Sequence, residues 1–307
     1  MSALVSQVNR QLARFLGIRI TRAEDLNTLI SQFDVANRDR RMLAEQLEIL
    51  RSMAKSLTNS PLAIRRICSV ARLLRPQRAQ GCGKIRLGGP HDGGYICLDD
   101  FVGIVAALSL GVGDDVSWDT DVANRGIIVH QYDHTVESAP AAHPNFRFNQ
   151  RKIGPVANDD SESIESVLGR NSFMEPATVL LKIDIEHDEW PVFDAASVSV
   201  LDKFAQIVCE FHGFDQVADD KWFERAYSVL EKLTKSFAVV HVHANNAAPM
   251  LAIGNLLFPQ LLEVTFASRA RYSFSDANEV FPGKLDSPNL TSGRDYNLGN
   301  FVYPVGS

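Results

Sequence analysis

The sequence predicts an α/β protein with a doubly wound, mostly parallel sheet of seven strands, preceded by an α-helical coiled-coil arm. Short apolar runs alternate with helical patterns between residues 105 and 266, which is typical of such a sheet. A glycine-rich turn, Gly111-Val112-Gly113, follows the first of these runs. Residues 1–80 carry 14 basic and 6 acidic side chains, whereas residues 81–307 carry 17 and 31. This charge division predicts a basic arm at 1–80 and an acidic globular body at 81–307.

The arm contains a candidate coiled coil at about residues 26–58. Its apolar residues recur at alternating steps of three and four, and nine of ten seam positions are apolar. A seam this narrow needs a partner helix, so we expect a homo-oligomer; the alternative is a helix packed on its own globular body. The seam positions are Leu26, Leu29, Phe33, Ala36, Arg40, Leu43, Leu47, Leu50, Ala54 and Leu57.

Two basic amphipathic segments, 4–20 and 62–78, flank the coiled coil. Helices of this kind lie on anionic membrane surfaces, although a charged helix face is more often simply solvated. Peripheral contact with the inner membrane surface is therefore one alternative for the arm.

The composition favours a soluble, cytoplasmic protein. Arg10 and Arg14 interrupt the first apolar stretch, so we expect no signal peptide, and no apolar run is long enough to cross a bilayer. The four cysteines form no C-x-x-C pair, which favours reduced thiols over a metal site or disulfides. The net charge of −6 excludes a polycation that binds nucleic acid.

Seven strands and three helices are expected in the body. The predicted strands are 105–110, 127–133, 146–148, 179–186, 207–212, 237–243 and 261–266. Helical patterns follow the glycine-rich turn up to Ala123 and cover 163–168 and 222–233.

Ligands of a doubly wound sheet lie beyond the carboxyl ends of its strands, where the glycine-rich turn is found. Gly111 and Gly113 would let the backbone approach a ligand closely. Asp133 ends the next strand, 20 residues after Gly113, where a carboxylate binds ribose hydroxyls. Both nicotinamide enzymes and S-adenosylmethionine (SAM) enzymes have this pattern.

The acidic character of the turn separates these two cofactors. The third glycine of the dinucleotide motif is absent, since its position is Val116. Asp114 and Asp115 lie where a pyrophosphate needs the positive end of a helix, and would repel it. SAM has no phosphate and carries an ammonium and a sulfonium group, so the acidic turn favours SAM.

Several motifs resemble those of the FkbM-type methyltransferases, which are SAM-dependent O-methyltransferases of sugars and polyketides. The segment 180–186 (LLKIDIE) followed by Glu189 is similar to their fourth-strand signature. A related branch of methyltransferase-like proteins is resembled by segments 86–95 (RLGGPHDGGY), 109–115 (SLGVGDD), 209–212 (CEFH) and 285–289 (LDSPN). The likeness covers about residues 84–300. His187 stands where the family usually has glycine.

The resemblance implies a Rossmann-like, class I methyltransferase sheet and assigns roles within it. Gly111 and Gly113 would line the methionine moiety, Asp133 would hold the ribose and Asp114 would meet the ammonium group. Asp92, Gly93 and Tyr95 belong to a segment that would close over cofactor or substrate, its alternative being an ordinary tight turn. The implied acceptor is a sugar or glycan hydroxyl, or another small molecule.

Methyl transfer to a hydroxyl needs a positioned acceptor and a group that takes or suppresses its proton. Three predicted strand ends carry pairs of ionisable residues two positions apart, which places each pair on one face. These pairs are Asp184 with Glu186, Glu210 with His212, and His241 with His243. We expect the three strands to be neighbours in the sheet, so that the three pairs meet at one edge.

Two mechanisms remain open for these candidate catalytic residues, Asp184, His212 and His241. In the first, His212 or His241 acts as a general base beside a carboxylate. In the second, Asp184, His241 and either Glu210 or His212 hold a divalent metal. Oxygen ligands favour Mg²⁺ or Mn²⁺, whereas added imidazoles would tolerate Zn²⁺ or Fe²⁺.

Two other functions are compatible with the sequence. One is a nicotinamide-dependent oxidoreductase, which Val116 and the acidic turn disfavour. The other is a non-catalytic SAM-binding scaffold, which the grouped carboxylates and histidines disfavour. For an active enzyme, the arm would oligomerise it or dock it to glycan-assembly machinery at a membrane.

Overall fold

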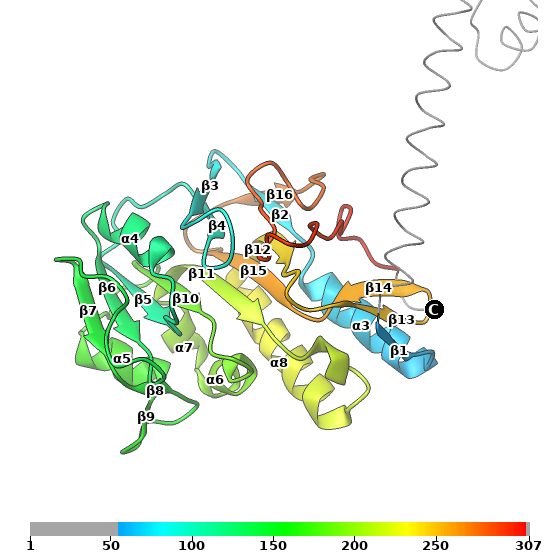
Figure 1. Ribbon diagram of the computed structural model, residues 1–307, viewed down its shortest axis with the longest axis horizontal. Coiled ribbons are helices and arrows are strands. Elements are labelled where there is room, and N and C mark those ends of the chain that lie inside the picture. Colours follow the sequence, from blue (N-terminus) through cyan, green and yellow to red (C-terminus); the bar gives the residue numbers. More distant parts are fainter. Residues whose placement is uncertain (1–54, 305–307) are drawn as a thin grey trace, which may run out of the picture. The chain divides into compact units, whose positions relative to one another are not determined.

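A seven-stranded sheet forms the centre of the protein (Figure 1). The computed structural model describes residues 55–304, so segment 4–20 and the coiled-coil positions up to Ala54 lie outside the described residues. The sheet order is β12-β15-β11-β10-β5-β6-β7. The bounds are β5 (Ala106–Leu110), β6 (Ile128–Tyr132), β7 (Phe146–Asn149), β10 (Val179–Ile183), β11 (Phe204–Phe211), β12 (Phe237–Ala244) and β15 (Leu262–Ser268). All seven predicted strands are therefore present.

The sheet is mixed because of one strand. β15 is antiparallel to both of its neighbours, β11 and β12, whereas the other neighbouring pairs are parallel. Counted in chain order, the strands stand as 3-2-1-4-5-7-6. The order reverses between β5 and β10, which is the topological switch point where such sheets bind ligands.

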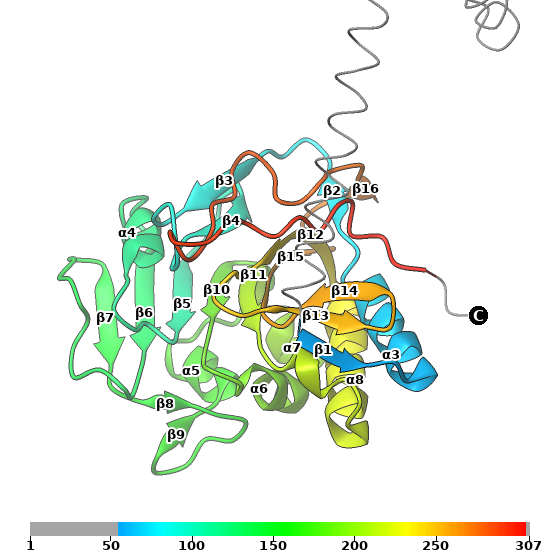
Figure 2. The ribbon, with the colours of Figure 1, turned by 45° about the vertical axis from the view of Figure 1, so that its right-hand side comes forward.

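Each face of the sheet has its own core, because side chains alternate along a strand. Leu108 and Leu110 pack with the helical layer, whereas Ala107 packs with the opposite layer. The helical layer contains α3 (Pro61–Leu73), α5 (Ile164–Arg170), α6 (Glu189–Ala195), α7 (Val198–Leu201) and α8 (Asp220–Ser236). Figure 2 shows these helices on one side of the strands.

A β-hairpin shares the opposite face with a single helix. α4 (Ser117–Ala123) and the hairpin of β3 (Lys84–Leu87) and β4 (Tyr95–Leu98) form this second core. β2 (Gln77–Ala79) pairs with β16 (Phe274–Asp276) beside them. The sheet is thus covered on both sides, by several helices on one face and by a hairpin with one helix on the other.

The predicted boundary at residue 80 is wrong, because residues 55–80 belong to the globular body. β1 (Lys55–Thr58) is a strand where the coiled-coil pattern predicts a helix; it pairs with β13 (Met250–Ile253), which pairs with β14 (Leu256–Pro259). The apolar stripe of α3 is buried in the main core through Ala63, Ile67, Val70, Ala71 and Leu74.

The basic side of α3 is also partly occupied by the protein itself. Arg66 is buried and donates hydrogen bonds to the carbonyl oxygens of Val217 and Ala218. The apolar stripe of segment 62–78 therefore packs inside the body. No helix among residues 55–304 is long and apolar enough to span a bilayer.

Three short elements and a long irregular segment complete the body. β8 (Lys152–Ile153), β9 (Ser161–Glu162) and the 3₁₀ helix η1 (Phe214–Gln216) lie in connections. After β16, residues 277–304 contain no further helix or strand, and Phe281 and Gly299 form an isolated β-bridge.

Candidate functional site

A cavity of about 380 Å³ lies at the switch point between β5 and β10. All seven residues predicted to bind the cofactor line it: Gly111, Gly113, Asp114, Asp133, Asp92, Gly93 and Tyr95. Asp184, predicted for the chemistry, lines it too. The structure therefore brings together residues that are up to 92 positions apart in the sequence.

The two glycines of the turn differ in what surrounds them. Gly111 has a φ of 79°, and a Cβ on it would lie 1.6 Å from the backbone oxygen of Asp184. Gly113 has a φ of 57°, and no atom lies within 4 Å of the position of its Cβ. Glycine is thus required at position 111 because the backbone at the end of β10 lies too close for a side chain, whereas Gly113 leaves open space at the cavity.

Asp133 fixes the conformation of this turn. One carboxylate oxygen accepts hydrogen bonds from the amides of Val112 (2.8 Å) and Gly113 (2.9 Å). The other accepts from the amide (2.7 Å) and hydroxyl (2.6 Å) of Thr135. Burial raises the pKa of Asp133, but these hydrogen bonds outweigh it, so the pKa lies below its ordinary value. All four acceptor sites are used, so a ribose hydroxyl would have to replace one of these donors.

The segment from Asp92 to Tyr95 is both a tight turn and a wall of the cavity. Gly93 has a φ of 81°, and a Cβ on Gly94 would lie 2.1 Å from the oxygen of Gly89. Arg86 holds the turn by donating to the carbonyl oxygens of Gly89 and His91. The Tyr95 hydroxyl donates to Asp184 (3.2 Å). The segment is therefore a tight turn that also stands beside the cavity, so an ordinary turn and a segment closing over a ligand are compatible interpretations.

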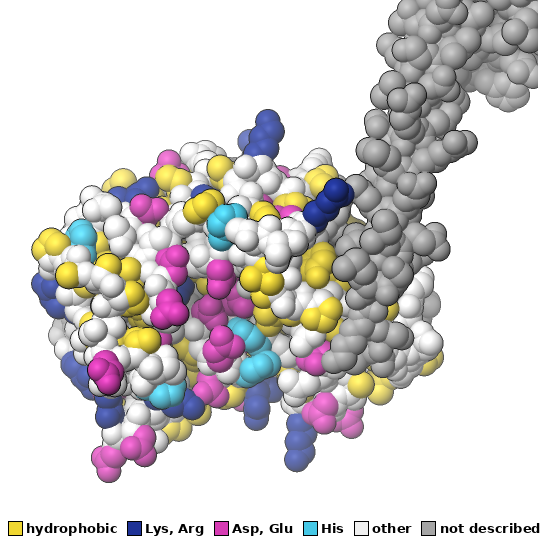
Figure 3. Space-filling view, in the orientation of Figure 1, with side chains coloured by type: hydrophobic (Ala, Val, Ile, Leu, Met, Phe, Trp, Pro, Cys, Tyr) yellow, Lys and Arg dark blue, Asp and Glu magenta, His cyan; other side chains and the backbone are white. Residues whose placement is uncertain are grey.

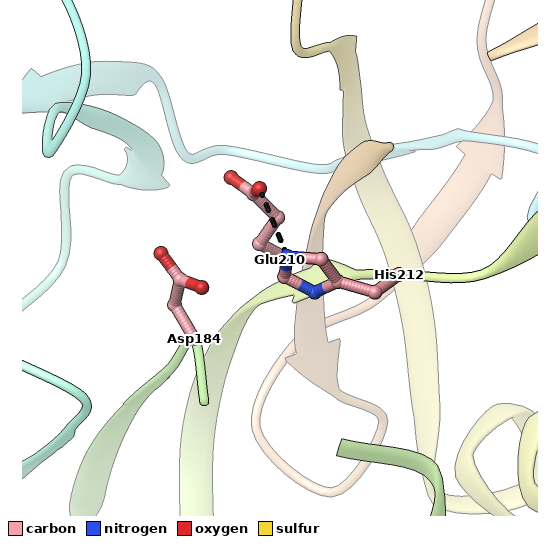
Figure 4. A group of neighbouring side chains, drawn as sticks. All are labelled: Asp184, Glu210 and His212. Atoms are coloured by element: carbon pink, nitrogen blue, oxygen red, sulfur yellow. Dashed lines mark ion pairs between the residues drawn. The ribbon is translucent and has the colours of Figure 1, made fainter. Parts of the chain in front are cut away.

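Asp184, Glu210 and His212 converge beside the cavity from the ends of β10 and β11 (Figure 4). One ligand atom of each lies within 4.8 Å of the others. The Nε2 atom of His212 is 3.4 Å from Glu186 and 3.6 Å from Glu210, and Nδ1 is 3.3 Å from Glu189. This set is called the Asp184–Glu210–His212 group below.

Burial dominates the electrostatics of this group. It raises the pKa of Asp184 to about 6, against the opposing charges of Lys182 and His212. Burial, then the charges of Asp184 and Glu263, hold the pKa of Glu210 well above its usual range. Burial lowers the pKa of His212, but Glu189 and the other nearby carboxylates outweigh it and raise the pKa overall. Carboxylates thus crowd a region that favours their neutral forms.

The turn after β10 departs from the predicted strand geometry. The strand ends at Ile183, so Asp184 and Glu186 do not alternate on a common face; Asp184 is half-buried and Glu186 is exposed. Glu186 and His187 have φ values of 52° and 78°, a conformation in which glycine is favoured. His187, which replaces the usual glycine of the resembled family, thus keeps the backbone conformation that glycine suits and brings its ring 4.9 Å from that of His212.

His241 does not join the Asp184–Glu210–His212 group, because β15 lies between β11 and β12. The prediction that the three strands are neighbours is therefore wrong. His241 is buried, and its Nε2 forms a hydrogen bond with Asp286 (2.7 Å). Burial lowers the pKa of His241, and Asp286 only partly offsets this effect.

A second network surrounds His243, two residues further along β12. Its Nδ1 bonds Glu263 (2.9 Å), and its Nε2 bonds both carboxylate oxygens of Asp295 (3.0 and 3.1 Å). Asn289 donates to Glu263 (2.6 Å) and to Asp92 (3.2 Å). Histidines of β12 thus hold the segment after β16 over the edge of the sheet.

Sequence reasoning missed Glu189 and Glu263 as parts of the site. Glu189 is fully buried, and one of its oxygens accepts the amide of Ile185 (2.8 Å). Glu263 is opposite both Glu210 and His243 on the antiparallel strand β15. Only the motif of the resembled family marked Glu189, and nothing in the sequence gave the direction of β15.

Acidic side chains gather near the centre of the face shown in Figure 3, with histidine side chains beside them. Two sets of possible metal ligands are found among the described residues: the Asp184–Glu210–His212 group, and Asp92, Glu210 and Glu263. Glu210 belongs to both sets. The site therefore offers oxygen and imidazole ligands directly beside the cavity.

Comparison with known proteins supports a methyltransferase family. No protein-family model matches the chain. A probable methyltransferase-like protein 24 from Rattus norvegicus is 29% identical over 188 residues, which cover 53% of this chain and 52% of that protein. Its namesake from Homo sapiens is 27% identical over 195 residues, covering 55% and 53%. The chain thus spans about half the length of the curated relatives it matches.

Among solved structures, a precorrin-6y C5,15-methyltransferase from Geobacter metallireducens GS-15 aligns with 66% of this chain and 88% of its own. Its identity is 11% and the TM-score is 0.27, values too low to show a common fold or function. The sheet itself, seven mixed strands with flanking helices, fits a Rossmann-like methyltransferase fold.

Proposed function

We propose that this protein is a SAM-dependent methyltransferase. The observation that carries the proposal is the cavity at the switch point, lined by both glycines of the turn, by Asp133 and by Asp184. A SAM molecule needs a close backbone approach, a carboxylate for its ribose and acidic groups for its ammonium and sulfonium. The curated relatives, which are named probable methyltransferase-like proteins, support the same class.

The start of α4 argues against a nicotinamide cofactor. A pyrophosphate would need the free amides at this helix end. Asp115 already accepts a hydrogen bond from the amide of Ser117 (2.6 Å), and Asp114 and Asp115 both line the cavity. A phosphate here would meet two carboxylates, whereas the positive groups of SAM would be attracted to them.

The acceptor we propose is a hydroxyl of a sugar or glycan, on the strength of the FkbM-type motifs. Its oxygen would attack the methyl carbon, the bond from that carbon to sulfur would break, and the electron pair would stay on sulfur as a neutral thioether. The hydroxyl proton must leave as the new bond forms. The Asp184–Glu210–His212 group is placed for this task, either with His212 as general base or through a bound divalent cation.

For the arm, we propose that residues 26–54 associate with a second copy of the chain. A cytoplasmic location and docking near a membrane surface remain part of the proposal. Size-exclusion chromatography with light scattering of the full chain and of a chain starting at residue 54 tests the oligomer. An equal number of chains per particle would contradict it.

Calorimetric titration with S-adenosylhomocysteine, with NADH as the control ligand, tests the cofactor. We expect micromolar affinity for S-adenosylhomocysteine and no heat with NADH. Binding of NADH alone would favour an oxidoreductase. If S-adenosylhomocysteine binds but no methyl group reaches nucleotide sugars, glycans or small-molecule hydroxyls, the scaffold function would replace the proposed one.

A further inference from the structure

We propose that Asp184, Glu210 and His212 are the protein ligands of one divalent cation, with Mn²⁺ as the ion that fits best. The three residues come from two adjacent strand ends, β10 and β11, and their ligand atoms lie within 4.8 Å of one another. Glu210 and His212 are each 4% exposed. A cation of ordinary size would contact all three after small side-chain rotations (Figure 4).

His212 supplies an observation independent of the carboxylates. It is almost fully buried, and its Nδ1 has no hydrogen-bond partner. Its Nε2 faces Glu210 at 3.6 Å and Glu186 at 3.4 Å. Two carboxylates thus face the Nε2 atom of a buried imidazole, and a cation bound between them would satisfy all three groups.

Glu189 is placed to orient this imidazole. Its carboxylate is 3.3 Å from Nδ1 of His212, on the side of the ring away from Glu210. Glu189 is completely buried, one oxygen accepts the amide of Ile185, and the other has no partner. Metal-bound histidines usually give their second N–H to such a carboxylate, which fixes the ring and its tautomer. Glu189 is therefore a positioning residue, not a ligand.

The second set of acidic residues is less free to bind a cation. Both oxygens of Glu263 have partners, Asn289 and His243. Asp92 also accepts from Asn289. By contrast, within residues 55–304 the Asp184 carboxylate accepts a side-chain hydrogen bond from the hydroxyl of Tyr95 alone. The cation therefore goes to Asp184 rather than to Asp92 and Glu263, although Glu210 is common to both sets.

The choice of ion follows from the ligands. Two carboxylates suit Mg²⁺ and Mn²⁺, whereas an imidazole is a poor ligand for Mg²⁺ and a good one for transition metals. Mn²⁺ accepts both kinds and retains open positions for water or an acceptor oxygen. Because Asp184 also lines the cavity, a hydroxyl there could bind the ion, which would lower its pKa and release its proton to water. That role in methyl transfer rests on the function proposed above; cation binding does not.

Mn²⁺ binding to the full chain, stripped with EDTA, is measured by the loss of the free Mn²⁺ signal in electron paramagnetic resonance. We expect one ion per chain. The variants Asp184→Asn and Glu210→Gln, which keep size and remove charge, should weaken binding by about 100-fold, at the upper end of what even an outer-shell change costs. Asp92→Asn is the matched control and should change affinity less than about threefold.

Thermal unfolding of each variant separates loss of a ligand from loss of the fold, and His212→Asn provides a third ligand variant. S-adenosylhomocysteine titration is run on the same samples, so failure of the cofactor proposal is visible separately from failure of the metal proposal. No Mn²⁺ binding by the folded wild-type chain would overturn the inference. So would a loss with Asp92→Asn while Asp184→Asn still binds.

Discussion

The backbone oxygen of Asp184 lies so close to Gly111 that a Cβ on this glycine would stand 1.6 Å away. This contact joins the end of β10 to the turn after β5, on which the cavity depends. The backbone amide of Asp184 also donates a hydrogen bond to the backbone oxygen of Leu110, the last residue of β5 (2.9 Å). The cavity and the Asp184–Glu210–His212 group therefore share one junction.

The first prediction concerns Gly111→Ala. The new methyl group must push β10 away while adopting a φ of 79°, so the free energy of unfolding should fall by about 3 kcal/mol. Gly113→Ala is the matched control, because no atom lies within 4 Å of its Cβ, and should cost only about 1 kcal/mol for its left-handed backbone. Urea denaturation measures both. Equal losses of unfolding free energy in the two variants would show that the cost comes from the backbone conformation rather than from the contact with Asp184.

The second prediction concerns Asp133→Asn. The amide keeps the shape of the carboxylate but loses its charge and one acceptor, while four donors of the chain still point at it. The variant should lose about 2 kcal/mol of stability. It should also bind S-adenosylhomocysteine at least about tenfold more weakly, or about 1.4 kcal/mol.

Thr135→Val separates the two roles of Asp133, in the turn and at the ribose. It removes the hydroxyl that competes for Asp133 but leaves the amide bonds of Val112 and Gly113. Affinity measured by calorimetry should be retained or improved if Asp133 accepts the ribose. A loss as large as that of Asp133→Asn would instead assign the cofactor contact to Thr135.

The strands could be predicted because a strand that is buried on both faces has a recognisable apolar sequence pattern. Runs such as 179–183 are apolar except for Lys182, as expected for a strand covered on both faces, and each run predicted as a strand is a strand in the structure. The residues of the cavity wall were also predictable. Gly111, Gly113, Asp133 and Asp184 follow the ends of parallel strands, which bring their carboxyl ends to one edge. Asp92, Gly93 and Tyr95 lie in the hairpin of β3 and β4 and were marked only by the family resemblance.

The position and direction of β15 could not be predicted in this way. Its pattern is that of any buried strand, and nothing in it tells whether the chain runs parallel or antiparallel to β11. Because β15 lies between β11 and β12, His241 is separated from Glu210, and Glu263 lies opposite Glu210 instead. Similarly, the amphipathic stripe of α3 indicates a buried face but does not name its partner, which is the body rather than a membrane.

The third prediction concerns pH and His243. Burial lowers the pKa of His243, but Asp295 and Glu263 outweigh it and raise the pKa to about 10. The folded state therefore holds a proton that the unfolded state releases near pH 6.5. The stabilisation from this group should be complete below about pH 6.5 and be lost as the pH rises towards 10.

Unfolding by urea at several pH values, for wild type and His243→Gln, measures this contribution. Other groups titrate over the same range, so the informative quantity is the difference between the two proteins. That difference should shrink steadily from pH 6.5 to pH 10. A difference that is independent of pH would mean that His243 contributes only packing and neutral hydrogen bonds.

The last prediction concerns Glu189→Gln, which tests a positioning role without removing a ligand. Glutamine can still accept the amide of Ile185 through its oxygen, so the turn before α6 should keep its shape. The same oxygen faces Nδ1 of His212, so the amide keeps this contact but removes the negative charge, which should reduce the basicity of the imidazole. We expect Mn²⁺ binding to weaken by about 10-fold to 100-fold, with unchanged affinity for S-adenosylhomocysteine, because Glu189 does not line the cavity.

If both affinities of the Glu189→Gln variant fall together, the residue supports the fold of the whole junction instead. If neither changes, the geometry of His212 is fixed by Trp190, whose indole donates to its backbone oxygen (2.7 Å), and not by the carboxylate.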